Sequence, residues 1–310
     1  MRFQLIVNPV AGRNRAGLLA EAVAQHLRAS GAEVALHVTQ SPGGARDFAA
    51  ALSAEACDRL VVVGGDGTLR EVVNSRPLPL PWPVGLVPMG TANVVGRELG
   101  MALTLEAQDH ATALLGASPW TVNALELTHA DGQRELAVAN VGAGLDAEVV
   151  RAVSVERARH HGLGGYAVWV RPILQTLVGY RAPRLRVRID GARLYEAAAV
   201  VVQGARSYGS VFELSPTTTL DAPQLSVALV LGPARRDLFR LLTRALVRRA
   251  ARDHDLLLLP ARELEISAER PLGLQADGDP AGETPVTVRL LPRVLTLLRA
   301  GARVPARGGA

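Results

Sequence analysis

The 310-residue sequence contains no lysine, so all 34 of its Lys and Arg residues are arginine. A Walker-type P-loop needs a lysine that reaches the terminal phosphates of its nucleotide. Protein kinases need a strand lysine that orients ATP, and pyridoxal enzymes and Schiff-base aldolases need a lysine amine that bonds to a carbonyl. The absence of lysine excludes all of these classes.

Cysteine and long apolar runs are also scarce. The single cysteine, Cys57, excludes an intrachain disulfide and a multi-cysteine zinc site, and we expect it to be buried in a reducing compartment. No stretch approaches the roughly 20 apolar residues that span a bilayer, and residues 77–96, the longest weakly charged stretch, contain five prolines. The N-terminus lacks an apolar segment of signal-peptide length. These features predict a soluble, cytoplasmic protein.

Length and charge set two further expectations. A chain of 310 residues exceeds the roughly 250–300 at which single cores stop growing, so two domains are predicted. The net charge of +5 favours anionic ligands, but it does not distinguish a nucleotide from a lipid headgroup or a nucleic acid.

The first third of the chain alternates short apolar segments with segments of helical periodicity. We predict strands at residues 3–7, 33–39, 60–63 and 84–87, and helices at residues 16–30, 44–56 and 69–74. Strands separated by helices indicate a doubly wound, mostly parallel sheet.

The pattern changes after about residue 120. Asp131-Gly132 is a hairpin signal between predicted strands at residues 122–128 and 135–141. Asp190-Gly191 is a second such signal, between predicted strands at residues 185–189 and 194–202. Further strands are predicted at residues 225–231, 263–267 and 286–291, and helices at 166–179 and 235–252. This region is expected to be a mainly antiparallel β-sandwich.

Residues 61–68 (VVVGGDGT) pass from an apolar strand through glycines directly into a helix. Such a turn points backbone N–H groups and the helix dipole at an anion, and glycine lets phosphate oxygens approach the backbone. Asp66 would repel a phosphate unless Mg²⁺ lay between them. We interpret the segment as a site for a metal-bound nucleotide; the alternative is a tight glycine-rich turn without a ligand.

Two more glycine-containing turns follow predicted strands, at residues 8–13 (NPVAGR) and 88–93 (PMGTAN). In a parallel sheet the loops at the carboxyl ends of the strands lie along one edge, where ligands bind. The three loops together therefore favour a single nucleotide site.

These motifs resemble those of the diacylglycerol kinase catalytic-domain family, which includes sphingosine kinases and bacterial lipid kinases. Residues 8–12 resemble its NPxxG turn, residues 64–68 its GGDGT signature with residues 71–74 as the continuation, and residues 85–93 its GxxPxGTAN element. In the second region, residues 140–147 (NVGAGLDA) and 275–280 (QADGDP) resemble its N-x-x-x-G-x-D-A and Q-x-D-G-E-P motifs.

The resemblance implies a fold of the NAD kinase and diacylglycerol kinase type, with ATP bound to the first domain beside the interdomain cleft. The expected domains are residues 1–118 for the nucleotide, residues 119–300 for the β-sandwich, whose last strand or helix returns to the first domain, and a flexible tail at 301–310. Asp279, supported by Asp277, would accept the proton of the lipid hydroxyl, and Asp66 would hold Mg²⁺. The nucleotide-binding residues would be Asn8, Pro9, Gly12, Thr39, Gly64, Gly65, Asp66, Gly67, Thr68, Gly90, Thr91 and Asn93.

The chain departs from the family pattern at several positions. Asp279 replaces a glutamate, Arg70 an asparagine, and Val94 an aspartate found in many members. Ala222-Pro223 interrupts the D-G-x-L motif that supports a structural metal, so the sequence leaves open whether a metal binds the second domain. Without lysine, arginines such as Arg13 or Arg70 would help to balance phosphate charge.

Five arginines recur every fourth residue in the helix predicted at 235–252: Arg236, Arg240, Arg244, Arg248 and Arg252. This spacing forms one slowly drifting stripe. It fits either a basic face on an anionic membrane or the solvated outer face of a helix packed on the sandwich.

We therefore predict an ATP- and Mg²⁺-dependent lipid kinase that associates transiently with the cytoplasmic face of a membrane and binds no nucleic acid. The alternatives are an NAD kinase-like enzyme with a soluble acceptor, and a degenerate relative that binds lipid or nucleotide without catalysis. The acceptor lipid and the oligomeric state, a homodimer included, remain open.

Overall fold

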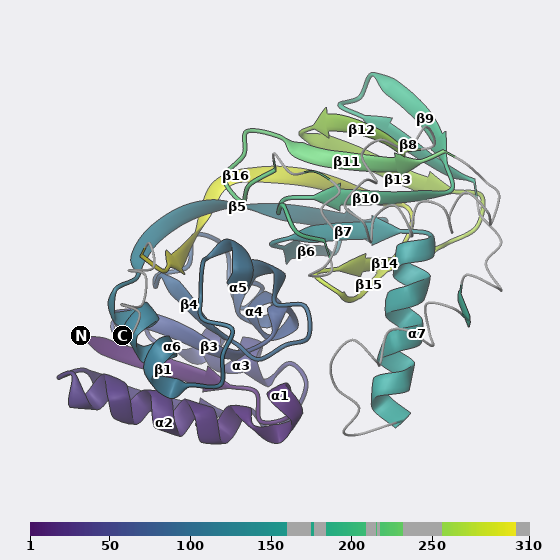
Figure 1. Ribbon diagram of the computed structural model, residues 1–310. Coiled ribbons are helices and arrows are strands. Elements are labelled where there is room, and N and C mark those ends of the chain that lie inside the picture. Colours follow the sequence, from purple (N-terminus) through teal and green to yellow (C-terminus); the bar gives the residue numbers. More distant parts are fainter. Residues whose placement is uncertain (160–174, 177–183, 209–214, 216–217, 232–255, 302–310) are drawn as a thin grey trace, which may run out of the picture. The chain divides into compact units, whose positions relative to one another are not determined.

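A computed structural model describes residues 1–159, 175–176, 184–208, 215, 218–231 and 256–301 (Figure 1). The chain divides into two compact units, one formed by Met1–Val122 with Leu295–Ala310 and the other by Asn123–Val294. The long strand β16 (Val286–Arg299) contributes to both units.

The first unit is an α/β domain with a parallel sheet, as predicted. Its strands lie in the order β2 (Glu33–Val38), β1 (Arg2–Val7), β3 (Arg59–Gly64), β4 (Val84–Pro88) and the end of β16. Its helices are α1 (Ala11–Asn14), α2 (Ala16–Ala29), α3 (Gly44–Ala51), α4 (Asp66–Val73), α5 (Val94–Glu98) and α6 (Ala107–Leu115). Residues 5–7 of β1 and 60–63 of β3 are fully buried. Both strands are continuous apolar runs because a parallel sheet is covered on both faces.

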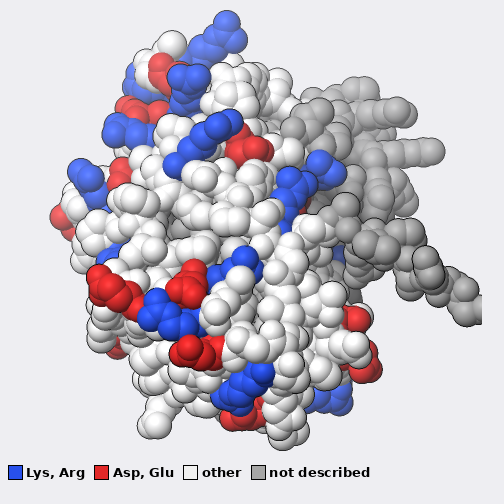
Figure 2. Space-filling model, turned by 90° about the vertical axis from the view of Figure 1, so that its left-hand side faces the viewer, with Lys and Arg blue, Asp and Glu red and all other residues white. Residues whose placement is uncertain are grey.

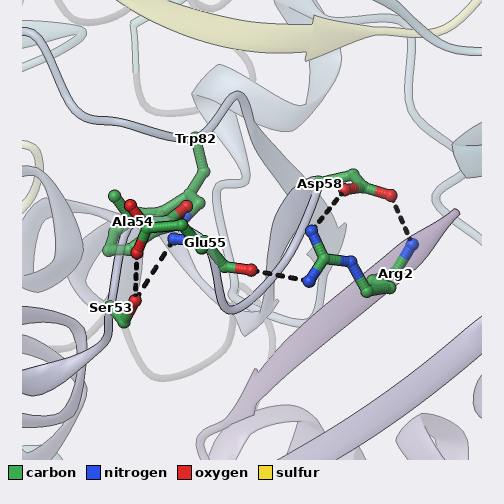
Figure 3. A network of polar contacts seen from close by, with 6 residues as sticks. All are labelled: Arg2, Ser53, Ala54, Glu55, Asp58 and Trp82. Atoms are coloured by element: carbon green, nitrogen blue, oxygen red, sulfur yellow. Dashed lines mark hydrogen bonds and ion pairs between the residues drawn. The ribbon is translucent and has the colours of Figure 1, made fainter.

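The helix predicted at residues 44–56 is shorter than expected, because α3 ends at Ala51. The segment that follows is anchored by long-range contacts (Figure 3). The indole N–H of Trp82 donates to the carbonyl of Ala54 (3.0 Å). The guanidinium of Arg2 donates to the carbonyl of Glu55 (2.6 Å) and to the carboxylate of Asp58 (3.0 Å). These contacts satisfy backbone groups outside a helix, and local periodicity cannot predict them.

The second unit consists of two antiparallel sheets around one core, which confirms the predicted sandwich. In one sheet, β16 pairs with β13 (Glu263–Ala268), β13 with β8 (Leu185–Ile189), and β8 with β9 (Arg193–Ala197); β5 (Ser118–His129) pairs with β16 and with β6 (Arg134–Ala137). The other has the order β12 (Leu256–Ala261), β11 (Leu225–Val230), β10 (Ala199–Gln203), β7 (Asn140–Ala143), β14 (Gly273–Ala276) and β15 (Asp279–Glu283). Side chains from both sheets share the core, among them Leu125, Val187 and Val200.

Both predicted hairpins form, but the second strand of each is divided between the two sheets. The strand predicted at residues 135–141 is β6 and then β7, and the strand predicted at 194–202 is β9 and then β10. At the first joint the carboxylate of Asp277 accepts backbone N–H groups, and at the second the N–H of Ala198 donates to the carbonyl of Val230 (2.7 Å). Partners distant in sequence therefore replace the strand partner at each joint.

Some elements of the structure were not predicted, and some predicted elements lie outside the described residues. Helix α7 (Leu145–Arg159) and strands β12, β14 and β15 were not expected. The helix predicted at 235–252, with its arginine stripe, nearly all of the helix predicted at 166–179, and residues 302–310 of the predicted tail lie outside the described residues. Cys57 is buried, as predicted, and burial raises the pKa of its thiol to about 11. In the described part of the chain, no helix has the length and hydropathy to cross a membrane.

Charge is mixed rather than segregated on the face shown in Figure 2, where arginine and acidic side chains alternate across a largely uncharged surface. Among the described residues of the second unit, Arg188 pairs with Glu265 (3.3 Å) and Arg289 with Glu263 (2.6 Å). The net positive charge is therefore not gathered into one field on that face.

Candidate active site

In the first unit, the three glycine-containing loops meet at the carboxyl edge of the parallel sheet. The N–H of Asn8 donates to the carbonyl of Val63 (3.0 Å), which ties the first loop to β3. The N–H of Met89 donates to the carbonyl of Gly64 (2.8 Å), and the N–H of Gly12 to the carbonyl of Met89 (2.9 Å). These bonds join the loops after β1, β3 and β4 into one structure.

The glycines in these loops allow the loops to touch one another. A Cβ on Gly90 would lie 2.8 Å from the Cα of Gly65, and a Cβ on Gly65 would lie 3.1 Å from the Cα of Gly90. Gly12 has a φ of +59° and faces the side chain of Met89 so closely that a Cβ there would overlap it. The close packing of the loops is thus one reason for glycine at these positions. The approach of a phosphate to the backbone would be a second reason.

Polar side chains at this edge hold the loops in shape. The amide of Asn8 donates to the hydroxyl of Thr68 (3.0 Å), and its oxygen accepts the N–H of Val10 (3.3 Å). Asn93, at a φ of +47°, closes its own turn by accepting the N–H of Gly90 (2.7 Å) and donating to the carbonyl of Gly90 (2.8 Å). The remaining predicted residues of these loops, Pro9, Gly67 and Thr91, lie in the same turns and in the first turn of α4.

Thr39 comes to the same edge from the end of β2. Its N–H and its hydroxyl both donate to the carbonyl of Val7, at 2.9 and 3.3 Å. The side chain is buried beneath the start of α3, where Gly44 packs on it. The structure thus places Thr39 beside the Asn8 loop.

Asp66 lies at the first position of α4 and is buried, with 8% of its surface exposed. Its two carboxylate oxygens accept the N–H groups of Val94 (2.9 Å) and Val95 (3.1 Å) at the start of α5. The carboxylate therefore caps a helix from another loop, a role that sequence reasoning missed. Glu71 acts similarly on α3, because its carboxylate accepts the N–H groups of Gly43 and Ala45, both at 3.1 Å.

The second unit holds the other predicted acidic residues on the β14–β15 hairpin. Asp277 and Gly278 occupy its turn, with φ values of +52° and +86°. The carboxylate of Asp277 accepts the N–H groups of Val138 and Ala139, both at 2.8 Å, and of Asn140 at 3.0 Å. Asp279, two residues on, begins β15 and is partly exposed. Both residues are partly exposed, and the carboxylate of Asp277 is anchored to the backbone between β6 and β7.

Asp146, on the first turn of α7, lies behind the same hairpin. Its carboxyl accepts the amide of Gln275 (2.6 Å) and the hydroxyl of Tyr208. The oxygen of the Gln275 side chain accepts the N–H of Gly278 (2.9 Å), which links Asp146 to the turn. The carboxyl keeps some accessible surface but is densely surrounded by protein atoms. This burial raises the pKa of Asp146 to about 7, although the bond from Gln275 works in the opposite direction.

Two family models match this chain. "Diacylglycerol kinase catalytic domain" matches residues 2–127, and "YegS C-terminal NAD kinase beta sandwich-like domain" matches residues 139–299. The chain belongs to the diacylglycerol kinase family. The three glycine-containing loops lie within the first matched range, and Asp277 and Asp279 lie within the second. The resemblance to the family is therefore confirmed.

Relatives of the diacylglycerol kinase family align over nearly the whole chain. The diacylglycerol kinase of Bacillus subtilis (strain 168) is 25% identical over 289 residues, which cover 92% of this chain and 91% of that protein. A diacylglycerol kinase of Staphylococcus aureus (strain MRSA252) is 25% identical over 300 residues, covering 94% and 90%.

Solved structures confirm the fold. The crystal structure of a diacylglycerol kinase from Bacillus anthracis str. Sterne has a TM-score of 0.75 and 22% identity, and the likeness covers 97% of each chain. An NAD kinase from Archaeoglobus fulgidus in complex with ATP has a TM-score of 0.51 and 14% identity, covering 96% of this chain and 93% of that one. At these identities the likeness establishes the fold alone.

The structure shows where two of the departures from the family motifs lie. Val94 replaces an acidic residue at the N-terminus of α5, where its N–H binds Asp66. Near the interrupted metal motif, the amide of Asn123 donates to the carbonyl of Ala222 (2.7 Å), and the hydroxyl of Thr219 donates to Asp221 (2.9 Å). Across the described residues, no three His, Cys, Asp or Glu side chains gather as a metal-binding group.

Proposed function

We propose that the protein is an ATP- and Mg²⁺-dependent lipid kinase that transfers the γ-phosphate of ATP to a hydroxyl of a lipid such as a diacylglycerol or a sphingoid base. The observation that carries the proposal is the joining of three glycine-containing loops at the carboxyl edge of the parallel sheet. This edge is where nucleotides bind in such folds. Membership in a family of lipid kinases supports a lipid acceptor.

The loop edge suits phosphate because the GGDGT turn leads directly into the N-terminus of α4, where the helix dipole favours an anion. In this proposal the GGDGT turn and the turn at residues 88–93 hold the phosphates. The 3.0 Å hydrogen bond from Asn8 to Thr68 fixes the loop at residues 8–13 against the GGDGT turn. Because these groups are fixed before the nucleotide arrives, they cost no reorganisation during transfer. Such a cradle needs no lysine.

Asp66 offers a single fixed carboxylate, since its bonds to α5 hold it in place. A magnesium ion in kinase sites uses one or two carboxylates together with substrate phosphates, so Asp66 fits a metal that arrives with the nucleotide. Bound there, the ion would neutralise charge on the transferring phosphoryl group. Asp66 thus has two roles in the proposal, as a ligand and as the cap of α5.

On the second unit, Asp279 is proposed to accept the proton of the lipid hydroxyl as its oxygen attacks phosphorus. Asp279 is partly exposed at the start of β15, and the carboxylate of Asp277 accepts three backbone N–H groups. We therefore assign Asp277 to positioning the hairpin and Asp279 to proton transfer.

The test is an incubation of the protein with γ-labelled ATP and mixed micelles that contain diacylglycerol, a sphingoid base or phosphatidylglycerol. Labelled lipid is expected, and chelation of Mg²⁺ should abolish it. Asp279→Asn should lose most of the activity while nucleotide binding is retained, because only the proton acceptor is altered. Glu283→Gln, at the other end of β15, is the matched control. The absence of labelled lipid from wild-type protein with every acceptor would refute the proposal, and labelling of NAD instead would favour the soluble-acceptor alternative.

A further inference from the structure

Gln275, a fully buried residue of β14, has hydrogen-bond partners at both ends of its side-chain amide. Its nitrogen donates to the carboxyl oxygen Oδ2 of Asp146 (2.6 Å) and to the side-chain oxygen of Asn140 (3.1 Å). Its oxygen accepts the backbone N–H of Gly278 (2.9 Å). The side chain therefore connects α7, which carries Asp146, to the turn between β14 and β15.

The N–H of Gly278 has no strand partner, so it needs this bond. Asp277 and Gly278 form a two-residue turn between the paired residues Ala276 and Asp279. A backbone N–H in such a turn lies outside the strand ladder, and a partly buried one must find a partner elsewhere. Because Asp279 is the next residue, the bond from Gly278 to Gln275 helps to set the direction in which the chain enters β15.

Asp146 determines which end of the Gln275 amide faces Gly278. A carboxylate only accepts hydrogen bonds, so it holds the amide nitrogen toward itself and leaves the amide oxygen toward Gly278. In the reversed orientation, the amide oxygen would face a carboxyl oxygen, and the NH₂ group would face the N–H of Gly278. Asn140 cannot make this choice, because its own amide can present a donor or an acceptor. The other carboxyl oxygen, Oδ1, accepts the hydroxyl of Tyr208, so a proton on Oδ1 would still leave Oδ2 as an acceptor.

The backbone next to these side chains leaves room for them. Gly142 on β7 is the cross-strand neighbour of Gln275. A Cβ on Gly142 would overlap the carboxyl of Asp146 and would lie 2.9 Å from the amide nitrogen of Gln275. The φ of Gly142 is outside the left-handed region. The close approach of the two side chains, and not the backbone conformation, therefore calls for glycine here.

Asp146 and the side chain of Asp279 lie on opposite faces of the sheet. Leu274 and Ala276 belong to the sandwich core, so Gln275 between them points to the other face. Helix α7 packs on β14 and β15. Asp279 is paired with Ala276, and directly paired residues of neighbouring strands share a face. Asp146 therefore acts on Asp279 through the backbone of the turn and does not share its face.

We propose that Asp146 is a positioning residue of the kinase reaction, which acts through Gln275 to fix the turn at residues 277–278 and thereby the placement of Asp279. The inference rests on the proposed function, in which Asp279 is the proton acceptor. A displacement of about 1 Å at a reacting group can lower a rate on the order of 100-fold. Loss of the Asp146 carboxyl should thus lower kcat and leave ATP binding intact, because the proposed nucleotide loops belong to the first unit.

The experiment measures kcat and KM for ATP in the kinase assay, and amide hydrogen exchange at Gly278 in the absence of substrates. In Asp146→Ala, exchange at Gly278 should be about tenfold faster, kcat should fall on the order of 10- to 100-fold, and KM for ATP should not change. Asp146→Asn should recover most of the lost kcat, because asparagine keeps an oxygen that can accept from Gln275. Glu148→Ala is the matched control, since Glu148 lies on the same helix and pairs with Arg151 (2.6 Å) instead of the turn.

An exchange of donor and acceptor separates positioning from a general loss of stability. In Gln275→Glu, two carboxyl groups would face each other, and kcat should fall as in Asp146→Ala. The double variant Asp146→Asn with Gln275→Glu again places one donor opposite one acceptor. The new asparagine donates to the new glutamate, whose oxygens still accept the N–H of Gly278. This double variant should recover most of the kcat that Gln275→Glu loses.

The two readouts separate this inference from the proposed function. Faster exchange at Gly278 in Asp146→Ala, without labelled lipid from the wild type, would support the connection from α7 to the turn and refute the kinase proposal. With an active wild type, the positioning role would be overturned by unchanged kcat or unchanged Gly278 exchange in folded Asp146→Ala. A folded double variant that is no more active than Gln275→Glu would overturn it as well.

Discussion

Removal of the Asp277 carboxylate by Asp277→Ala should loosen the joint between β6 and β7. The carboxylate accepts three backbone N–H groups, those of residues 138, 139 and 140, at 2.8 to 3.0 Å. Hydrogen bonds to a charged group each contribute about 1.5–3 kcal/mol. Because the three bonds share one half-buried carboxylate and are not additive, we expect a total loss of about 3 kcal/mol.

Amide hydrogen exchange can detect this loss locally. At tenfold for each 1.4 kcal/mol, the amides of residues 138–140 should exchange on the order of 100-fold faster in Asp277→Ala. Kinase activity should fall as well, because the same joint positions the hairpin that carries Asp279. The matched control is Asp131→Ala, since Asp131 accepts a single backbone N–H, that of Gln133, at an exposed turn (2.9 Å).

Asp277 and Asp279 should respond differently in the exchange assay. In Asp279→Asn the protection of residues 138–140 should stay at its wild-type level while activity is lost. If protection of these three amides in Asp277→Ala equals that of the wild type, the carboxylate does not hold the joint and its assignment as a positioning residue is wrong.

Three further predictions concern other residues. Gly90→Ala should cost about 1–3 kcal/mol in thermal unfolding and weaken ATP binding, because a Cβ would lie 2.8 Å from the Cα of Gly65; unaltered ATP binding would contradict it. Glu71→Gln should lower stability by about 1 kcal/mol through the lost cap of α3, with Glu33→Gln as the control. For Asp146, a folded pKa raised to about 7 means that stability is fully present below about pH 4 and falls as pH rises to 7; Asp146→Asn should flatten that part of the denaturation profile.

Much of the fold followed from local pattern. Residues 60–63 read as a buried strand because every side chain is apolar, and that is how they lie in β3. Both aspartate-glycine hairpins were recognisable because their turn chemistry is local. The helix predicted at residues 44–56 was too long. The guanidinium of Arg76, remote in sequence, donates to the carbonyls of Ala49, Ala50 and Leu52 at the end of α3.

Part of the candidate site could likewise be predicted from the sequence, and part could not. Motif spacing identified the loops at residues 8–13, 64–68 and 88–93, because glycine-rich turns after apolar strands have a local signature. The roles of Asp66 and Asp277 as caps of distant backbone were not predictable, since each binds N–H groups 28 or more residues away.

By itself, the sequence determined the class of protein: no lysine, glycine-rich turns in family order and a change from alternating helices and strands to antiparallel hairpins. These are local properties, set by side-chain chemistry and backbone preference over a few residues. The tertiary structure alone decided which carboxylates accept backbone N–H groups from distant parts of the chain. Hydrogen-bond satisfaction depends on what surrounds a group in space, and only the folded chain brings those partners together.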